Sequence, residues 1–431
     1  MPASIRFVRA VTFSFIAVPG TTLAAQFDYS LYAGVEHSNN INLSHENPIS
    51  EDVLIPGLNF TYEQQGSTLQ ANVFGALEYH DYTHGKFDNQ TQTQLAGQAN
   101  WTMLPQRLDF SVEDFASVQP VDSLASNSPD NQQQTNVIAL GPTLHLHFGD
   151  ALRGQFELRY INSYASKVDN FNSSRGLAAA RLFREINPTD QLSVNVESQH
   201  VDFTNNGGAN YDRHEIYVGY SSKLAQFDVD AALGWSKLDF DSAPGDSSPL
   251  VQLTLGWRPT QRSTFSLSGA YQYSDAAQGM LPSQGQTLNA AISSVNVGNA
   301  VIDSQVYQER SLQATYNLRT ERLTVSVTPL FRKLHYLNDT TFDQTARGGN
   351  VTLGYLLRPQ LTLSALITGE KLTYQTLDRH DRTVRFGLDL SRQWTRHWSA
   401  NISVDRQRRN SDVPSQSYRE TRIFLGVVFR R

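Results

Sequence analysis

Histidines that stand close together in the sequence are the first candidates for chemistry. His145 and His147 lie two residues apart and would share one face of a strand, as two metal ligands do. No third ligand follows at a suitable spacing, so polar residues near a turn are the favoured interpretation over a metal site. The segment Asp239-Phe240-Asp241 lacks the spacing of a calcium-binding loop and is interpreted as a solvated turn.

A second group of residues could support hydrolysis. His200, Asp202 and His214 flank the polar segment 205–210, and Asp, His and Ser together form the triad of many hydrolases. The sequence contains so many serines that no nucleophile stands out. Because the geometry of the three groups decides the question, a hydrolase stays open as an alternative.

Composition excludes several other classes. The 431 residues include no cysteine, which excludes a disulfide scaffold and a cysteine-ligated metal site. The 35 Lys and Arg face 41 Asp and Glu, a balance that does not favour a nucleic-acid partner. The pairs Gly207-Gly208 and Gly348-Gly349 lack a phosphate-loop pattern and are predicted to be turns. We therefore expect no catalytic residues, no cofactor and no metal.

The amino-terminal residues resemble an export signal. Arg6 and Arg9 precede an apolar run over residues 10–18, and small residues allow cleavage after Ala24 or Ala25. An apolar run of this length is too short to span a membrane. We expect residues 1–25 to be a cleaved signal peptide and residues 26–431 to form a single domain without an amino-terminal plug.

These candidate residues must be positioned by strands, because the dominant period of the remaining chain is two. Phe156, Leu158 and Tyr160 alternate with Glu157 and Arg159, and similar alternation recurs along the sequence. Such alternation places the two sets of side chains on opposite faces of a strand. No apolar stripe with a helical period competes with it.

The connections between the expected strands are of two kinds. Short turns are expected near residues 65–66, 105, 149–150, 188, 225, 259, 320, 359 and 395. Long polar segments alternate with them, at residues 37–51, 119–134, 241–248, 275–304 and 337–346. Short periplasmic turns and long extracellular loops are typical of a bacterial outer-membrane barrel. The sequence thus predicts an all-β, antiparallel transmembrane β-barrel of about 20 strands, with 18 as the alternative count. A soluble repeat protein such as a propeller would have no reason to sort its loops by length.

Aromatic residues support this prediction. Amphipathic rings favour the headgroup level on both sides of a membrane. Trp101, Trp257, Trp394 and Trp398 stand beside expected short turns. The residues toward the long loops are Trp235, Tyr79, Tyr160, Tyr271, Tyr273 and Tyr374. We expect these residues to form two aromatic girdles, although strands are also enriched in aromatic residues generally.

The residues opposite the apolar sets are polar and of both signs. If the apolar sets face lipid, the other sets face a polar lumen. The charged candidates for lining it are Arg153, Glu157, Arg159, Glu197, Asp228, Asp230, Arg385, Asp389 and Asp405. Segment 275–304 contains an apolar stretch over residues 290–302. We expect this segment to fold into the barrel mouth and narrow it; the competing account is that it extends two strands above the membrane.

Both ends of the chain resemble those of known outer-membrane proteins. Ile423, Leu425, Val427 and Phe429 form one apolar face, which resembles the carboxy-terminal signal recognised by the barrel-assembly machinery. Such proteins usually end on the aromatic residue, whereas Arg430 and Arg431 follow it here.

The first expected hairpin runs Tyr-Ala-Gly-Val-Glu-His-Ser-Asn-Asn-Ile-Asn-Leu over residues 32–43. This segment resembles the β-barrel porin family of outer-membrane proteins associated with exopolysaccharide biosynthesis and export. The resemblance implies location in the bacterial outer membrane among its lipids, with polysaccharide and components of an export system as candidate partners. It supplies no catalytic residues.

Two classes of function follow. The first is a porin-like channel, or an accessory in exopolysaccharide export, without enzymatic activity. The second is a barrel enzyme with its active site at the extracellular rim, or a structural or adhesive barrel that acts through its loops.

Overall fold

The structure, a computed structural model, describes residues 25–281 and 300–431. The predicted signal peptide therefore lies, apart from Ala25, outside the described residues. The strands of the first half are β1 (Gln26–Ser38), β2 (Glu51–Gln65), β3 (Leu69–Tyr82), β4 (Gln90–Leu104), β5 (Leu108–Pro120), β6 (Gln132–His147), β7 (Leu152–Ala165), β8 (Ser173–Glu185), β9 (Asp190–Phe203) and β10 (Tyr211–Lys223). Those of the second half are β11 (Phe227–Phe240), β12 (Asp246–Thr260), β13 (Ser263–Asp275), β14 (Val306–Arg319), β15 (Leu323–Tyr336), β16 (Gln344–Arg358), β17 (Leu361–Tyr374), β18 (Arg379–Gln393), β19 (Trp398–Ser411) and β20 (Tyr418–Arg430).

The helical elements of the described chain are short. They are α1 (Ala276–Met280) and the 3-10 turns η1 (Pro129–Asn131), η2 (Asp169–Phe171), η3 (Gly207–Ala209), η4 (Thr340–Phe342) and η5 (Pro414–Gln416). None of the helices in this part of the chain has the length and apolar character needed to cross a membrane.

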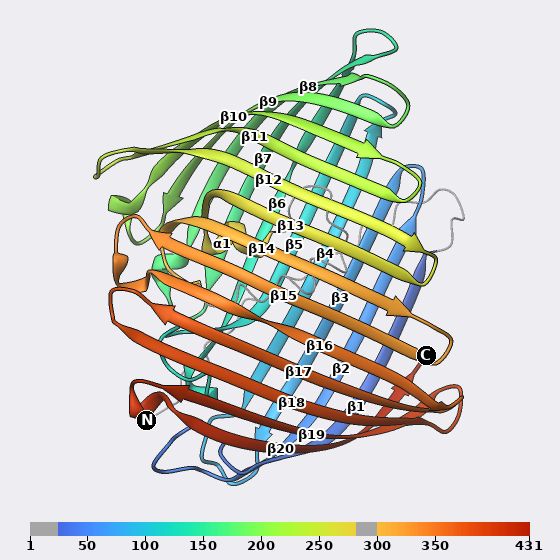
Figure 1. Cartoon of the computed structure of the whole chain (residues 1–431), viewed down its shortest axis with the longest axis vertical. Helices are drawn as coiled ribbons and strands as arrows, with labels where there is room; N and C mark the ends of the chain where they lie inside the picture. Colours follow the sequence, from blue (N-terminus) through green and yellow to red (C-terminus); the bar gives the residue numbers. More distant parts are fainter. Residues whose placement is uncertain (1–24, 282–299) are drawn as a thin grey trace, which may run out of the picture.

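The strands close into one barrel (Figure 1). Each strand pairs antiparallel with its neighbours in the chain, and β1 also pairs with β20, from Ser30 opposite Arg430 to Ser38 opposite Arg422. The sheet has 20 strands and no free edge strand. The prediction of an all-β antiparallel barrel of about 20 strands is confirmed.

The two ends of the barrel differ in the length of their connections. At one end, two to four residues join consecutive strands, as in the turn 66–68 between β2 and β3. At the other end the connections are longer, except for the four residues between β17 and β18, and the one between β13 and β14 spans residues 276–305. The predicted short turns lie at or next to observed ones, except that Pro259 belongs to β12 and its turn follows at residues 261–262.

One predicted turn is wrong. Gly348 and Gly349 lie inside β16, not in a turn. A Cβ atom at Gly348 would approach the Gly369 carbonyl oxygen to 2.2 Å, and one at Gly349 the Thr328 carbonyl oxygen to 2.5 Å. These glycines therefore permit close approach of neighbouring strands. In the sequence alone, a glycine pair with this role looks the same as a glycine pair in a turn.

Alternation along each strand produces two different barrel surfaces. On β7, Phe156, Leu158 and Tyr160 are exposed on the outside, whereas Glu157 between them is buried. A continuous exposed apolar surface of this size is favourable only in contact with lipid. The five tryptophans Trp101, Trp235, Trp257, Trp394 and Trp398 are all exposed, with relative accessibilities of 48%, 51%, 42%, 51% and 47%.

Two tyrosines expected in the girdle lie elsewhere. Tyr273 is 1% exposed and Tyr374 is 2% exposed. Tyr374 lies on the inner face of β17 beside Ala346 and Leu372, because Lys371 and Thr373 occupy the alternating outer positions. Tyr273 occupies an outward position of β13, but its side chain is covered because the barrel wall is split next to this strand.

The barrel wall splits between β12 and β13 at the long-loop end. Pairing of these strands stops at Val251 opposite Tyr271, although β13 continues to pair with β14 up to Asp275. The ends of β13 and β14 lean into the barrel, so that Tyr273 and Val306 pack against residues of the inner surface of β9 to β11. Those residues are Val201, Phe203, Ala209, Tyr211 and Leu238. Because these strand ends lean inward, α1, which follows β13, lies in the lumen.

Candidate functional site: the lumen and its mouth

The predicted lumen residues occupy inward positions of their strands. Arg153, Glu157 and Arg159 lie on β7, Glu197 on β9, Asp228 and Asp230 on β11, Arg385 and Asp389 on β18, and Asp405 on β19. In each strand the alternate positions carry exposed apolar side chains, for example Val196 beside Glu197 and Val404 beside Asp405.

A first ion-pair network crosses the inner wall from β5 to β9. Arg159 pairs with Glu113 at 3.0 Å and also with Glu157. Glu157 in turn pairs with Arg181 of β8, which reaches Glu197 at 2.9 Å. This first network therefore alternates acids and bases without an excess of cations.

A second network lies on β18–β20 and β1. Asp405 accepts from Arg385 and, at 3.4 Å, from Arg422. Arg422 also lies 3.7 Å from Glu420 and 3.8 Å from Glu36. Because β8 and β18 stand half a circuit apart in the 20-stranded sheet, the two networks occupy opposite walls of the lumen. The remaining predicted charges include the pairs Arg153–Glu185 at 2.7 Å and Asp228–Arg258.

Sequence reasoning missed several partners in these networks. Arg181 belongs to a strand of small residues, in which the polar and apolar faces are hard to tell apart. Its spacing of six residues from Arg175, an even number, could have placed both on one face. Arg422 could have been found more directly, because Ile423 and Leu425 were already assigned to the outer face of β20.

The mouth at the long-loop end is filled by the connection between β13 and β14. We call its described parts, residues 276–281 and 300–305, together with Asp275 at the end of β13, the lumenal segment. Asp275 at the end of β13 pairs with Arg175 of β8 at 2.6 Å and accepts from the Tyr211 hydroxyl. Its other carboxylate oxygen accepts from the Gln278 backbone N–H at 3.0 Å and caps α1. Asp275 thus starts the helix and fixes it to the inner face of β8 and β10.

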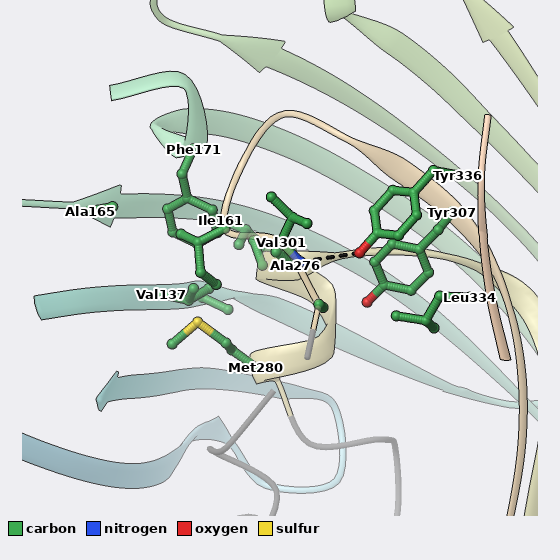
Figure 2. Close-up of a cluster of buried hydrophobic side chains, with 14 residues drawn as sticks. Val137, Ile161, Ala165, Phe171, Ala276, Met280, Val301, Tyr307, Leu334 and Tyr336 are labelled. Carbon is green, nitrogen blue, oxygen red and sulfur yellow. Dashed lines mark hydrogen bonds between the residues drawn. The ribbon is translucent and has the colours of Figure 1, made fainter. Parts of the chain in front are cut away.

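Apolar contacts hold the rest of the lumenal segment (Figure 2). Met280 points toward Val137 and Ile161 on the inner faces of β6 and β7. The Val301 backbone N–H donates to the Tyr336 hydroxyl at 3.0 Å, a bond drawn in Figure 2. The segment folds inward as predicted where the structure describes it; residues 282–299, which include most of the predicted apolar stretch, lie outside the described residues.

A second loop crosses the mouth in the other direction. Leu124, in the connection between β5 and β6, packs against Ala346, Leu372 and Tyr374 of β16 and β17. Its carbonyl accepts from Arg379 of β18 at 2.9 Å. The connection between β5 and β6 docks on β16 to β18. The lumenal segment, which follows β13, docks on β6 to β8. The sequence did not indicate this second crossing.

The lumen is more open toward the short turns. Asp230 and Thr254 occupy inward positions in that half and are nevertheless exposed. Inward residues near the mouth, such as Phe115 and Val137, are buried. The described part of the barrel is therefore a polar vestibule that is open toward the short turns and covered toward the long loops.

The residues first singled out for chemistry do not assemble into a reaction centre. His145 lies 3.1 Å from Asp109 near a short turn. His200 contacts Asp212 at 2.8 Å, and Asp202 accepts from Asn210 at 3.0 Å. Across the described residues, no group of three or more His, Asp or Glu is placed to hold a metal ion.

His214 meets a serine on the outer surface. Its Nδ1 lies 3.0 Å from the Ser198 hydroxyl. Asp212 is engaged with His200 instead, so the pair has no carboxylate to orient its imidazole among the hydrogen bonds of the described residues.

The closed wall, the apolar outer surface and the polar lumen define a porin-like β-barrel of the bacterial outer membrane. Its carboxy-terminal residues 344–431 match the family model described as "Putative beta-barrel porin 2". The resemblance seen in the sequence is thereby confirmed for the region from β16 to the end of the chain. No curated protein sequence matches the chain.

The chain is also similar to solved structures of iron-uptake receptors. A mutant of the ferric enterobactin receptor PfeA from Pseudomonas aeruginosa is 10% identical, with 95% of this chain and 81% of that chain covered and a TM-score of 0.49. The FrpB iron transporter from Neisseria meningitidis is 9% identical, with 94% and 81% covered and a TM-score of 0.45. The siderophore receptor PirA from Acinetobacter baumannii is 10% identical, with 95% and 81% covered and a TM-score of 0.45. At these identities and scores, the likeness says nothing about the substrate of this chain.

Proposed function

We propose that this barrel is a loop-gated, non-enzymatic channel for an uncharged hydrophilic solute of the saccharide class. The observation that carries the proposal is the mutual pairing of the lumenal charges. Glu157 shares its carboxylate between two arginines, and Asp405 does the same on the opposite wall. Paired charges present hydrogen-bonding groups while their long-range fields largely cancel, which suits a neutral polyhydroxylated solute better than an ion.

A role in polysaccharide export is the finer form of this proposal. It is supported by the vestibule that is open toward the short turns, the expected periplasmic side. A solute could enter there and meet the lumenal segment before release. The partners proposed with it are polysaccharide and components of an export system. None of the solved structures named above is an export protein, so this role is supported by the lumen and by the family resemblance alone.

The alternative functions have weaker support. The Ser198–His214 contact is the observation that would favour a rim hydrolase, but the neighbouring carboxylates bind other groups. An adhesive barrel would present its long loops outward, whereas two of these loops dock inside the mouth.

Planar-bilayer recording tests the proposal. The purified barrel should show low conductance with brief openings and little preference between cations and anions. Neutral oligosaccharides added on the short-turn side should block the open current in proportion to their length, whereas charged oligosaccharides of equal size should block less well. Strong ion selectivity, or open current that no oligosaccharide blocks, would refute a saccharide channel.

A further inference from the structure

The outer surface of β14–β20 carries a concentration of cations at the long-loop end. We call these residues the basic belt: Arg310, Lys333, Arg347, Lys371, Arg382, Arg406, Arg408 and Arg419. All occupy outward positions. Residues an even number of positions away on the same strands share their face, and those residues are apolar and exposed, such as Leu312, Val404 and Ile423. The belt thus faces away from the lumen and plays no part in the proposed channel.

The strand register places like charges directly opposite each other. Arg310 pairs in register with Lys333. Lys371 stands between Arg347 and Arg382, with one on each neighbouring strand. Arg408 similarly pairs with Arg419. Like charges at directly opposed positions destabilise a sheet unless an anion neutralises them.

The protein itself supplies little neutralisation. No ion pair within the described residues joins a member of the basic belt to an acid. The nearby loop acids contact histidines instead: Asp343 lies 2.6 Å from His335 and Asp412 lies 2.9 Å from His380. Outside this arc, the outward cation Lys237 of β11 is paired with Asp239 at 2.8 Å. The lack of paired acids is therefore a property of the β14–β20 arc.

Two hollows lie within the basic belt. One is lined by Gln308, Arg310, Lys333 and His335, and the other by Thr345, Arg347, Lys371, Thr373 and Gln375. Each hollow combines two cations with amide or hydroxyl groups that can donate hydrogen bonds. This set of donors matches the oxygens of a phosphate group, which arginine can bind through two parallel hydrogen bonds.

Aromatic rings and apolar neighbours indicate where the basic belt lies relative to the membrane. The Arg310 guanidinium lies 4.8 Å from the centre of the Tyr271 ring, and that of Arg347 lies 5.8 Å from the centre of Phe331. Leu312, two residues from Arg310, is 52% exposed on the outer surface. The belt therefore follows directly on the lipid-facing band, where the headgroups of the outer leaflet lie.

We propose that the basic belt binds the phosphate groups of a phosphorylated glycolipid, lipopolysaccharide, in the outer leaflet. The opposed cations supply the charge complementarity, and the lipid-facing residues below them accommodate its acyl chains. Binding on the β14–β20 arc alone would orient the barrel relative to its lipid neighbours. The site is independent of transport through the lumen.

Retention of lipid by matched variants tests the proposal. The probe is purified lipid A with both phosphates, offered to the full-length barrel in detergent and measured by native mass spectrometry. The triple variant R347Q, K371Q, R382Q should retain about 100-fold less lipid A than the native barrel, since each cation near an anionic lipid surface contributes appreciably to binding. Two controls remove a cation outside the belt, K237Q on β11 and R396Q at a short turn, and should retain lipid A normally. Heat-modifiable migration on gels confirms that every variant has folded.

Two further arms identify the ligand chemistry. Dephosphorylated lipid A should bind the native barrel as weakly as intact lipid A binds the triple variant. Inorganic phosphate at millimolar concentration should not displace intact lipid A, because it lacks acyl chains. Equal retention by native and triple-variant barrels would overturn the proposal, and so would complete displacement by inorganic phosphate.

Discussion

Arg175 and Asp275 form a buried ion pair that joins the wall of the barrel to its own lumenal segment. The Arg175 Nη1 and Asp275 Oδ2 atoms are 2.6 Å apart, and both side chains are 2% exposed. One residue lies on β8 and the other at the end of β13. The pair therefore ties the start of α1 to a strand that lies five strands away from β13 in the sheet.

Removal of this pair should open the mouth. The D275N variant keeps the size of the side chain but leaves Arg175 charged and without its acid. Breaking a buried ion pair in this way costs about 3–5 kcal/mol. The docking of the lumenal segment in the mouth should become less favourable by this free energy. Single-channel recording should show longer openings than in the native barrel. The D239N variant, which breaks an exposed pair on the outer surface, should leave open times unchanged.

Deletion of residues 277–303 should enlarge the pore. The deletion removes Met280 and Val301, whose contacts with β6, β7 and β15 fill the mouth. The conductance of a single open channel should rise, and larger oligosaccharides should enter. An unaltered conductance in a correctly assembled barrel would contradict the role of the lumenal segment as a constriction.

The loop between β5 and β6 should act as a second gate. In the L124D variant, a carboxylate would replace an apolar side chain that packs on Ala346 and Leu372. Burial of an unpaired carboxylate there is unfavourable by at least about 1–3 kcal/mol, so the loop should leave its docking site. Open probability should increase beyond that of D275N when the two changes are combined. The exposed substitution N127D in the same loop is the matched control.

Lumenal charge pairs should set ion preference. The E157Q variant removes one negative charge from the first network, in which Arg159 and Arg181 keep Glu113 and Glu197 as partners, so reversal potentials measured in a salt gradient should shift toward anion selectivity. The R385Q variant leaves Asp405 with less neutralisation and should shift them toward cation selectivity. Shifts of the same sign in both variants would show that these residues do not line the conducting path.

Cysteine labelling should establish the orientation. The native sequence contains no cysteine, so a single introduced thiol gives an unambiguous signal. In intact cells, a membrane-impermeant maleimide should label E46C in the connection between β1 and β2 but not R396C in the turn between β18 and β19. Labelling of both sites after cell lysis is the control. The opposite pattern would invert the assigned topology.

The wall of this barrel could be predicted from sequence because each strand carries its own evidence. Alternation of Glu157 with Phe156 and Leu158 needs only a period of two and an apolar environment outside. Short turns could be placed for the same reason, since Gly and Pro act locally. The inward assignments of Asp228 and Asp405 follow from such local patterns.

The inward fold of the lumenal segment could be expected from its apolar residues, but the contacts that close the mouth could not be predicted in the same way. Docking of Leu124 on Leu372 joins positions far apart in sequence, and neither residue differs in type from an ordinary loop or strand leucine. The split between β12 and β13 similarly places Tyr273 inside despite its outward position. The pairing of Arg181 with Glu157 was missed because the alternation of small residues on β8 gives a weak signal.

The crossing loops also imply an order of events during assembly. Leu124 can reach the Arg379 side chain only when β18 stands opposite β5, and that position exists only once β20 has met β1. Contacts between positions so distant in the chain form late, because loop closure must come first. We expect newly inserted barrels to be leaky until the mouth has folded, so the wall is complete before the pore is sealed.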